Sequence, residues 1–380
     1  MSNFVQLTMN GAGPGLCLTC GSLRHCFITL YLLSDYPAKL TVHTSEGALM
    51  SPDKSRDQDL RRFSEMRALV TGGAGFIGSH LTERLVDAGA KVLVIDDMSN
   101  GVQQNLSAVK DRITLRRGSI VDTALARSAV KEHEPEIVFH LAARNLVMSI
   151  KDAREDAAVT IIGLLNLLDA IRQTDRTETF VHSSTGSVYG EPVESPQTEK
   201  HSRTPTSPYG ISKMAAEDYL RVWNKLYGTQ YVALRYYNVY GPRQSANEST
   251  GGGVIPVFAN RLLAGQPLTV DGTGKQQRCF TYVSDVVKAN LLAALNRKCW
   301  CDFYNIATTE RIDVLSLAKL MMEVSGVKTP IKFGPERPGD IMRFDPSIEL
   351  AARRMGYAPE VSLRDGLAFY FEWLRSTRKQ

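Results

Sequence analysis

The sequence predicts an α/β protein whose helices and strands alternate around a doubly wound parallel sheet. Two observations predict this fold class. From Met66 onward, short apolar runs that end in glycine or small polar residues alternate with segments of helical periodicity. The first of these runs, Ala68-Leu69-Val70, leads directly into a glycine-rich turn, as a first buried strand does in such folds.

The turn after this first strand has the spacing of a dinucleotide-binding loop. Gly73, Gly75 and Gly78 fit the pattern G-x-G-x-x-G. Apolar residues then recur at helical spacing from Ile77 until Gly89 ends the helix. A strand, a tight turn and a helix in this order place the first amides of the helix where they can receive a pyrophosphate.

A second buried strand, Lys91 to Ile95, ends in an acidic residue, Asp96. A carboxylate at this distance from the glycine turn accepts hydrogen bonds from the adenosine ribose. Because the same carboxylate disfavours a 2′-phosphate, the sequence favours NAD over NADP. The Rossmann type of doubly wound sheet is therefore expected.

Three further strands end in small or polar residues. They lead to Gly118-Ser119-Ile120, to His140-Leu141-Ala142-Ala143 and to Ser183-Ser184-Thr185. Ligands of doubly wound sheets bind outside the carboxyl ends of the strands. We therefore expect these three segments to form walls of a cofactor and substrate site.

The segment Tyr209-Gly-Ile-Ser-Lys213 is a candidate for chemistry. On a helix the tyrosine and the lysine share a face because they are four residues apart. A free tyrosine has a pKa of about 10, so about one in a thousand is ionised at pH 7, and a neighbouring ammonium favours the charged form. We expect Lys213 and the positive nicotinamide ring of NAD together to lower the pKa of Tyr209 and so make it a base.

These motifs together resemble the extended short-chain dehydrogenase/reductase family, in particular its NAD-dependent nucleotide-sugar epimerases and dehydratases. The resemblance runs from Met66 to about Arg378 and is closest to UDP-glucose 4-epimerase-like proteins. The segments that carry it are Thr71 to Gly78, His140 to Ala143, Ser183 to Gly190, Tyr209 to Lys213, Arg235 to Arg243 and Arg337 to Asp340. It implies that a Rossmann domain is followed by a smaller C-terminal α/β substrate-binding domain.

The resemblance assigns roles to particular residues. It implies that Thr185, Tyr209 and Lys213 are catalytic, and that Thr185, Asn238, Arg278, Arg337 and Asp340 bind the nucleotide sugar. The residues implied to bind NAD are Gly72, Gly75, Phe76, Ile77, Gly78, Asp96, Ser119, Ile120, Leu141, Ala142, Ala143, Tyr209, Lys213 and Tyr236. The family usually has acidic residues where Ser119 and Cys279 stand, so the contacts near the cofactor and near Arg278 differ here from the family's pattern.

The residues after Thr185 separate the reaction classes. Dehydratases of the family place Asp-Glu directly after the threonine, and decarboxylases keep a glutamate there, whereas this chain has Gly186-Ser187. Because the chain lacks a base that could remove a proton from a sugar carbon, reversible oxidation at the sugar C4 is the one of these reactions that remains. The resemblance then implies 4-epimerisation of a UDP-glucose or UDP-galactose type of substrate through a 4-keto sugar, with NAD regenerated in each turnover.

Other readings of the same residues stay open. The alternatives are a 4-keto sugar reductase, a 4-epimerase of UDP-glucuronate or of N-acetylhexosamines, and a non-catalytic dinucleotide-binding regulator. Asp96 argues against the reductase because that enzyme needs exchangeable NADPH. We expect Phe344 to crowd the sugar 2-position and to favour UDP-glucose over its N-acetyl counterpart, although a core aromatic is a nearly equal interpretation.

Composition limits the remaining function classes. The chain has 380 residues, 43% of them hydrophobic, and a net charge of +5 without a lysine-arginine block, which disfavours a nucleic-acid surface. No apolar segment has the length and purity of a membrane span. The six cysteines form no disulfide framework, so we expect a cytoplasmic protein. The resemblance implies a homodimer.

The expected domains follow from these motifs. Residues 1–65 form an extension outside the fold, residues 66–240 form the NAD-binding domain with a return segment near 281–307, and residues 241–380 form mainly the substrate-binding domain. We expect no metal site: Cys17, Cys20, His25 and Cys26 lack a second paired half, and the adjacent His25 and Cys26 could hardly both reach one tetrahedral ion.

Overall fold

A seven-stranded sheet in which every neighbouring pair is parallel organises the structure, which is a computed structural model. The strand order is β13-β8-β7-β6-β3-β4-β5, so the order reverses beside β3, as in a doubly wound sheet. The strands are β3 (Arg67–Thr71), β4 (Lys91–Asp96), β5 (Ile113–Arg117), β6 (Ile137–His140), β7 (Thr179–Thr185), β8 (Tyr231–Tyr236) and β13 (Asp302–Ile306). The predicted fold class is confirmed.

The structure describes residues 4–5, 18–19, 61–246, 252–336 and 342–378. Contacts divide the chain into residues 1–59 and residues 60–380. The first unit contains one antiparallel pair, β1 (Phe4–Val5) and β2 (Leu18–Thr19). The second unit contains the sheet and every other element named below.

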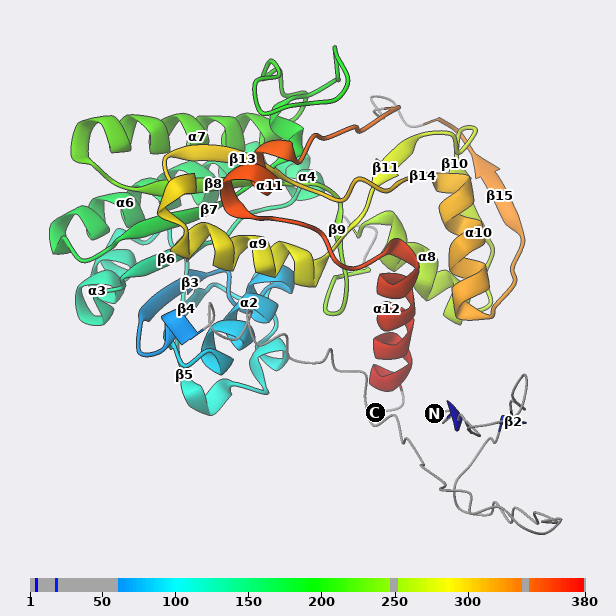
Figure 1. Cartoon of the computed structure of the whole chain (residues 1–380), viewed down its shortest axis with the longest axis horizontal. Coiled ribbons are helices and arrows are strands. Elements are labelled where there is room, and N and C mark those ends of the chain that lie inside the picture. The colour runs from blue at the N-terminus through cyan, green and yellow to red at the C-terminus, as the bar shows by residue number, and fades with distance from the viewer. Residues whose placement is uncertain (1–3, 6–17, 20–60, 247–251, 337–341, 379–380) are drawn as a thin grey trace, which may run out of the picture. The chain divides into compact units, whose positions relative to one another are not determined.

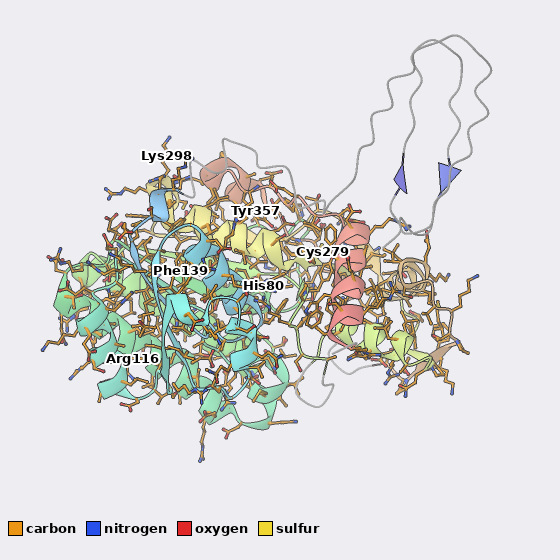
Figure 2. The ribbon with its side chains drawn as sticks, turned by 90° about the horizontal axis from the view of Figure 1, so that it is seen from below. His80, Arg116, Phe139, Cys279, Lys298 and Tyr357 are labelled. Carbon is orange, nitrogen blue, oxygen red and sulfur yellow. The ribbon has the colours of Figure 1, made fainter. Side chains whose placement is uncertain are left out.

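Helices cover both faces of the sheet (Figure 1). On one face, α2 (Phe76–Asp87) and α9 (Val283–Leu295) pack with the sheet in one apolar core, which α11 (Glu349–Met355) also joins. On the other face, a second core holds α3 (Thr123–His133), α6 (Gly163–Thr174) and α7 (Pro208–Tyr227). Phe139 lies inside the sheet, whereas Arg116 lies on the edge strand β5 (Figure 2).

The remaining elements gather around a third apolar core. Figure 1 shows α8 (Val254–Leu263), α10 (Val314–Ser325) and α12 (Leu363–Thr377) beside one another and away from the large sheet. Three small strand pairs accompany them: β10 (Leu268–Asp271) with β15 (Ile331–Gly334), β11 (Gln277–Cys279) with β14 (Arg311–Asp313), and β9 (Val239–Tyr240) with β12 (Thr281–Tyr282).

The chain starts to pack on the sheet before Met66. Phe63 is fully buried in the core beside α2, and the short helical turn Arg61–Phe63 precedes β3. Glu65 donates its amide to Gly89 O and pairs with Lys91. The second unit thus begins at residue 60. The boundary that the sequence predicts lies later, after residue 65. The sequence does not indicate this earlier start, because Phe63 is a single apolar residue in a charged segment.

Helix α7 is positioned by clear signals at both ends. Ser207 caps α7 by accepting a hydrogen bond from Gly210 N, Pro208 occupies its first turn, and Gly228 ends it with a φ of 73°. Helices α4 (Leu146–Lys151) and α5 (Ala153–Ala157) precede α6 in the chain, and a π-helical segment, Ala158–Ile162, joins α5 to α6. Such wide turns are frequent at functional sites.

Candidate active site

A cleft of about 690 Å³ lies at the carboxyl ends of the central strands. Residues from the ends of β4, β6, β7 and β8, the glycine turn after β3 and the start of α7 line it. Every residue that the sequence assigned to the cofactor is among the lining residues. The structure therefore brings together segments that are spread from Gly72 to Tyr236 in the sequence.

The glycine turn has no room for side chains. Gly72 has a φ of +70°, and a Cβ atom on it would lie 2.8 Å from Ala142 N. A Cβ atom on Gly78 would lie 2.1 Å from Gly72 O. Because α2 starts at Phe76 and no side chain caps its N-terminus, its first amides face the turn with only small groups around them. This cradle fits a pyrophosphate.

Asp96 stands at the end of β4 and lines the cleft. Its carboxylate accepts hydrogen bonds from Ala74 N and Met98 N, both at 2.9 Å. Burial raises the pKa of this carboxyl, and the two amides act against that rise. A Cβ atom on Gly101 would lie 2.6 Å from Asp96 Oδ1, so the loop after β4 closes over the carboxylate. The remaining lone pairs can accept ribose hydroxyls.

Helix α7 places Tyr209 and Lys213 in the same wall of the cleft. Lys213 is 1% exposed, and its Nζ donates to Ser183 O at 2.6 Å. The amide of Tyr209 donates to Ser149 Oγ at 3.1 Å, which ties the start of α7 to α4. Thr185 ends β7, and its Oγ1 accepts a hydrogen bond from Ser187 N at 3.1 Å. A side-chain hydrogen bond links Thr185 to Tyr209.

The electrostatics of Tyr209 differ from the expectation. Burial raises its pKa to about 12, and the hydrogen bond with Thr185 acts in the opposite direction. Burial also lowers the pKa of Lys213 to about 8. In the protein without NAD, desolvation of the phenol dominates. The expected lowering also depends on the charge of the nicotinamide ring, so the role of Tyr209 as a base stays a prediction.

Asp156 is a charged group near this pair that sequence reasoning missed. It lies on α5, which packs against α7, and its side chain is fully buried. Its charge raises the pKa of both Tyr209 and Lys213. Burial raises the pKa of Asp156 itself, against the hydroxyl of Ser212 and the positive charge of Lys213. No motif marked this residue, since a single aspartate in a helix is usually exposed.

Tyr237 fills the space beside Gly186, the residue that follows Thr185. A Cβ atom on Gly186 would lie 2.5 Å from two atoms of the Tyr237 ring. That ring is 2% exposed and meets Phe344 edge to face, with centroids 6.0 Å apart. The guanidinium of Arg278 lies 5.0 Å from the centroid of the Phe344 ring. A row of contacts therefore leads from Gly186, the residue after Thr185, to Arg278.

The structure brings together part of the predicted substrate set. Asn238 adopts a φ of 37° and donates from Nδ2 to Cys279 O at 3.0 Å, next to Arg278 in β11. Arg278 also donates to Gln277 O. Thr185, Asn238 and Arg278 lie outside the lining of the described cleft. Arg337 and Asp340 lie outside the described residues.

Several lining residues had no assigned role in the sequence. They include the loop after β4, the residues that follow Ala143, and the segment after β9: Asp97, Ser99, Asn100, Val102, Arg144, Asn145, Arg243, Gln244 and Ser245. Arg243 closes one of the motif segments, and the others lie next to such segments, which was the one available signal. The four candidate metal ligands between Cys17 and Cys26 lie outside the described residues. The described part of the chain holds no cluster of three metal-binding side chains.

Comparison with known proteins decides the family. The model of the family described as GDP-mannose 4,6 dehydratase matches residues 69–369. UDP-glucose 4-epimerase from Mycolicibacterium smegmatis is 34% identical over 314 residues, which are 82% of this chain and 99% of that protein. The chain belongs to the extended short-chain dehydrogenase/reductase family of nucleotide-sugar epimerases and dehydratases.

Solved structures of this epimerase and dehydratase family share the fold. The UDP-glucose 4-epimerase of Thermotoga maritima, solved with UDP-glucose, has a TM-score of 0.78 and 39% identity, and covers 82% of this chain and 100% of its own. The Thermus thermophilus UDP-glucose 4-epimerase in complex with NAD has a TM-score of 0.74 and 36% identity, with 82% and 99% covered. Other relatives carry the names of dehydratases, decarboxylases and epimerases of other nucleotide sugars.

One further finding concerns membranes. Among the helices of the described residues, none is both long and apolar enough to cross a bilayer.

Proposed function

We propose that this chain is an NAD-dependent 4-epimerase of nucleotide sugars of the UDP-glucose and UDP-galactose type. The proposal rests on the family, on the cleft and on the contents of the wall beside Thr185. The observation that carries it is the contact between Gly186 and Tyr237, because it separates epimerisation from the other reactions of the family.

The cleft residues fit NAD. The crowded glycines give the pyrophosphate access to the amides of α2, and Asp96 offers acceptors for ribose hydroxyls while disfavouring a 2′-phosphate. NAD, when bound, supplies a hydride acceptor and a positive charge beside the phenol of Tyr209. That charge favours the phenolate, which the protein alone does not, since burial raises the pKa of Tyr209 to about 12.

The protein side chains divide the proton chemistry among themselves. Tyr209 removes the proton of the sugar C4 hydroxyl, and Thr185 holds that oxygen through its own hydroxyl. Lys213, fixed by Ser183 O, keeps a donor in the same wall of the cleft. The same groups can return the proton when the C4 carbonyl is reduced from its other face, which makes the step reversible.

The residues after Thr185 support epimerisation over elimination. A dehydratase needs a carboxylic acid beside the sugar C5 and C6, and the resembling enzymes carry it directly after the threonine. Here position 186 is glycine, and the ring of Tyr237 occupies the volume of any side chain at that position. Proton abstraction from carbon therefore lacks its base, and oxidation at C4 remains.

We also propose a homodimer that forms through α7. This helix exposes a row of apolar side chains: Ile211 is 52% exposed, Val222 is 41% exposed and Leu226 is 63% exposed. Ile150 of the neighbouring α4 is 65% exposed. Exposed apolar side chains on one helix and its neighbour favour an interaction site, and a second copy offers a matching face. Val222→Glu combined with Leu226→Glu should yield a monomer in light scattering, and an unchanged mass contradicts the interface.

The catalytic proposal is tested by Tyr209→Phe. This change keeps the packing of the ring and removes the proton acceptor, so turnover should be nearly abolished while binding of NAD and of the nucleotide sugar is retained. Thr185→Ala should cost about one to three orders of magnitude in turnover. Steady-state rates and equilibrium binding measure both effects. A wild-type rate in Tyr209→Phe would show that the assignment is wrong.

A further inference from the structure

Glu217 is a fully buried carboxylate on the same helix as Tyr209 and Lys213, one turn beyond the lysine. Its Oε1 accepts hydrogen bonds from Ser184 Oγ at 2.6 Å and from Arg235 Nε at 2.8 Å. Its Oε2 accepts from Arg235 Nη2 at 2.7 Å and from Arg203 Nη1 at 3.3 Å. Both oxygens therefore have two donors, and the negative charge is paired with a cation that is itself 2% exposed.

The partners of Glu217 form one row across the sheet. Ser184 of β7 is registered with Arg235 of β8, and Arg235 is registered with Asn305 of β13. Arg235 Nη1 donates to Tyr189 OH at 2.6 Å, and Tyr189 OH donates to Asn305 Oδ1 at 2.8 Å. Side chains of neighbouring strands in register share a face of the sheet. Glu217 thus attaches α7 to three adjacent strands through this polar row.

The row ends at the catalytic wall. Ser183 and Ser184 line the cleft, and Thr185 follows directly. The carbonyl of Ser183 accepts from Lys213, while the hydroxyl of Ser184 donates to Glu217, so two consecutive residues of β7 are tied to α7 one turn apart. These two ties fix how the end of β7 sits against the helix that carries Tyr209.

We propose that Glu217 is a positioning residue, which holds Thr185 at the working distance from Tyr209 through its hydrogen bond to Ser184 and its pairing with Arg235. A buried ion pair gains little stability over an apolar pair of similar volume, so geometry rather than stability is its use here. Proton transfer depends steeply on that geometry, since a misplacement of about 1 Å can cost about a hundredfold in rate. The proposal rests on the proposed 4-epimerase function.

Two substitutions test the positioning role of Glu217 in the NAD-loaded full chain. Ser184→Ala removes the tie to β7 and leaves the pair of Glu217 with Arg235 intact, so the protein should fold. Glu217→Gln keeps the shape, removes the negative charge that pairs with Arg235 and should lower kcat in the same way as Ser184→Ala. Ser325→Ala is the matched control, because it deletes a buried hydroxyl that bonds to Met322 O and Val327 N at the end of α10, outside the cleft.

Three readouts are compared: kcat, KM for the nucleotide sugar, and hydrogen exchange of the amides at the end of β7. Ser184→Ala should lower kcat about tenfold to a hundredfold, with KM within about twofold of wild type and faster exchange at the end of β7. Ser325→Ala should change none of the three. An unchanged kcat, or a loss expressed in KM alone, overturns the proposal. If the wild-type chain turns over no nucleotide sugar, the proposed function fails. Unchanged hydrogen exchange at the end of β7 in Ser184→Ala would then overturn the positioning role of Glu217 separately.

Discussion

The ring of Tyr237 occupies the position of a side chain at Gly186, with two ring atoms 2.5 Å from the place of a Cβ atom. Gly186→Ala should therefore destabilise the fold by about 1–3 kcal/mol through overpacking. Tyr237→Val has its own cost as a core truncation, but it vacates the same volume, so Gly186→Ala should cost less in the Tyr237→Val background than in wild type. Urea unfolding of the single and double variants measures the coupling.

Gly253→Ala is the control for this contact. Gly253 has a φ of −64°, and a Cβ atom on it would have 3.5 Å to its nearest neighbour, so the substitution should be nearly neutral. Additive free energies for Gly186→Ala and Tyr237→Val would contradict the contact between the two positions.

The start of the fold can be tested by truncation. A chain that begins at Met66 lacks Phe63, which is fully buried, and the ion pair of Glu65 with Lys91. A chain that begins at residue 60 keeps both. We expect the shorter chain to lose about 3–5 kcal/mol, as for removal of a buried phenylalanine. Thermal melting compares the two, and equal melting temperatures would show that the segment is dispensable.

Lys213 should make stability depend on pH in a defined direction. Burial lowers its pKa from 10.5 to about 8, so the charged form is disfavoured in the folded state. The penalty is fully present below about pH 8 and disappears as the pH rises towards 10.5. At pH 7 it amounts to about 3 kcal/mol, part of which the hydrogen bond to Ser183 offsets.

Lys213→Met should therefore match or exceed the wild-type unfolding free energy at pH 7, lose that advantage near pH 10, and have almost no activity. Denaturant unfolding of NAD-free protein at both pH values provides the measurement. Lys225→Met, at an exposed position of the same helix, should show no such dependence. A stability loss in Lys213→Met that is constant with pH would rule out the burial penalty.

Phe344 provides a test of sugar preference. Its ring contacts both Tyr237 and Arg278, so two contacts fix its position. If it crowds the sugar 2-position, wild type prefers UDP-glucose and UDP-galactose over their N-acetyl counterparts, and Phe344→Ser shifts kcat/KM towards the N-acetyl pair. A wild-type preference for the N-acetyl pair, or an unchanged ratio in the variant, would refute this role.

The sequence was most informative where one segment carries both a turn and a ligand contact. The glycine turn, Asp96 and the pair of Tyr209 and Lys213 were predictable because their spacing is local, and all of them line one cleft. The row of Ser184, Arg235 and Asn305 was not predictable, since it depends on strand register. The contact of Tyr237 with Gly186 and the burial of Asp156 likewise depend on packing between distant segments.

The raised pKa of Tyr209 likewise could not be predicted from the sequence. Helical spacing indicated that Lys213 shares a face with Tyr209, but it could not give the desolvation of the phenol, which raises its pKa to about 12. Desolvation depends on every neighbour that surrounds the ring, and the groups that act on the phenol, Thr185 and Asp156, come from β7 and α5. Charge patterns along one helix therefore predict proximity better than they predict the protonation state.

The central claim is tested most directly by incubating the freshly purified protein with UDP-glucose, without added cofactor, and separating the sugars. The 4-epimerase account predicts that UDP-galactose forms to a constant ratio, that the reverse reaction from UDP-galactose reaches the same ratio, and that denatured protein releases NAD. A 4,6-dehydrated or decarboxylated product, or turnover that requires added NADPH and consumes it, would contradict the account.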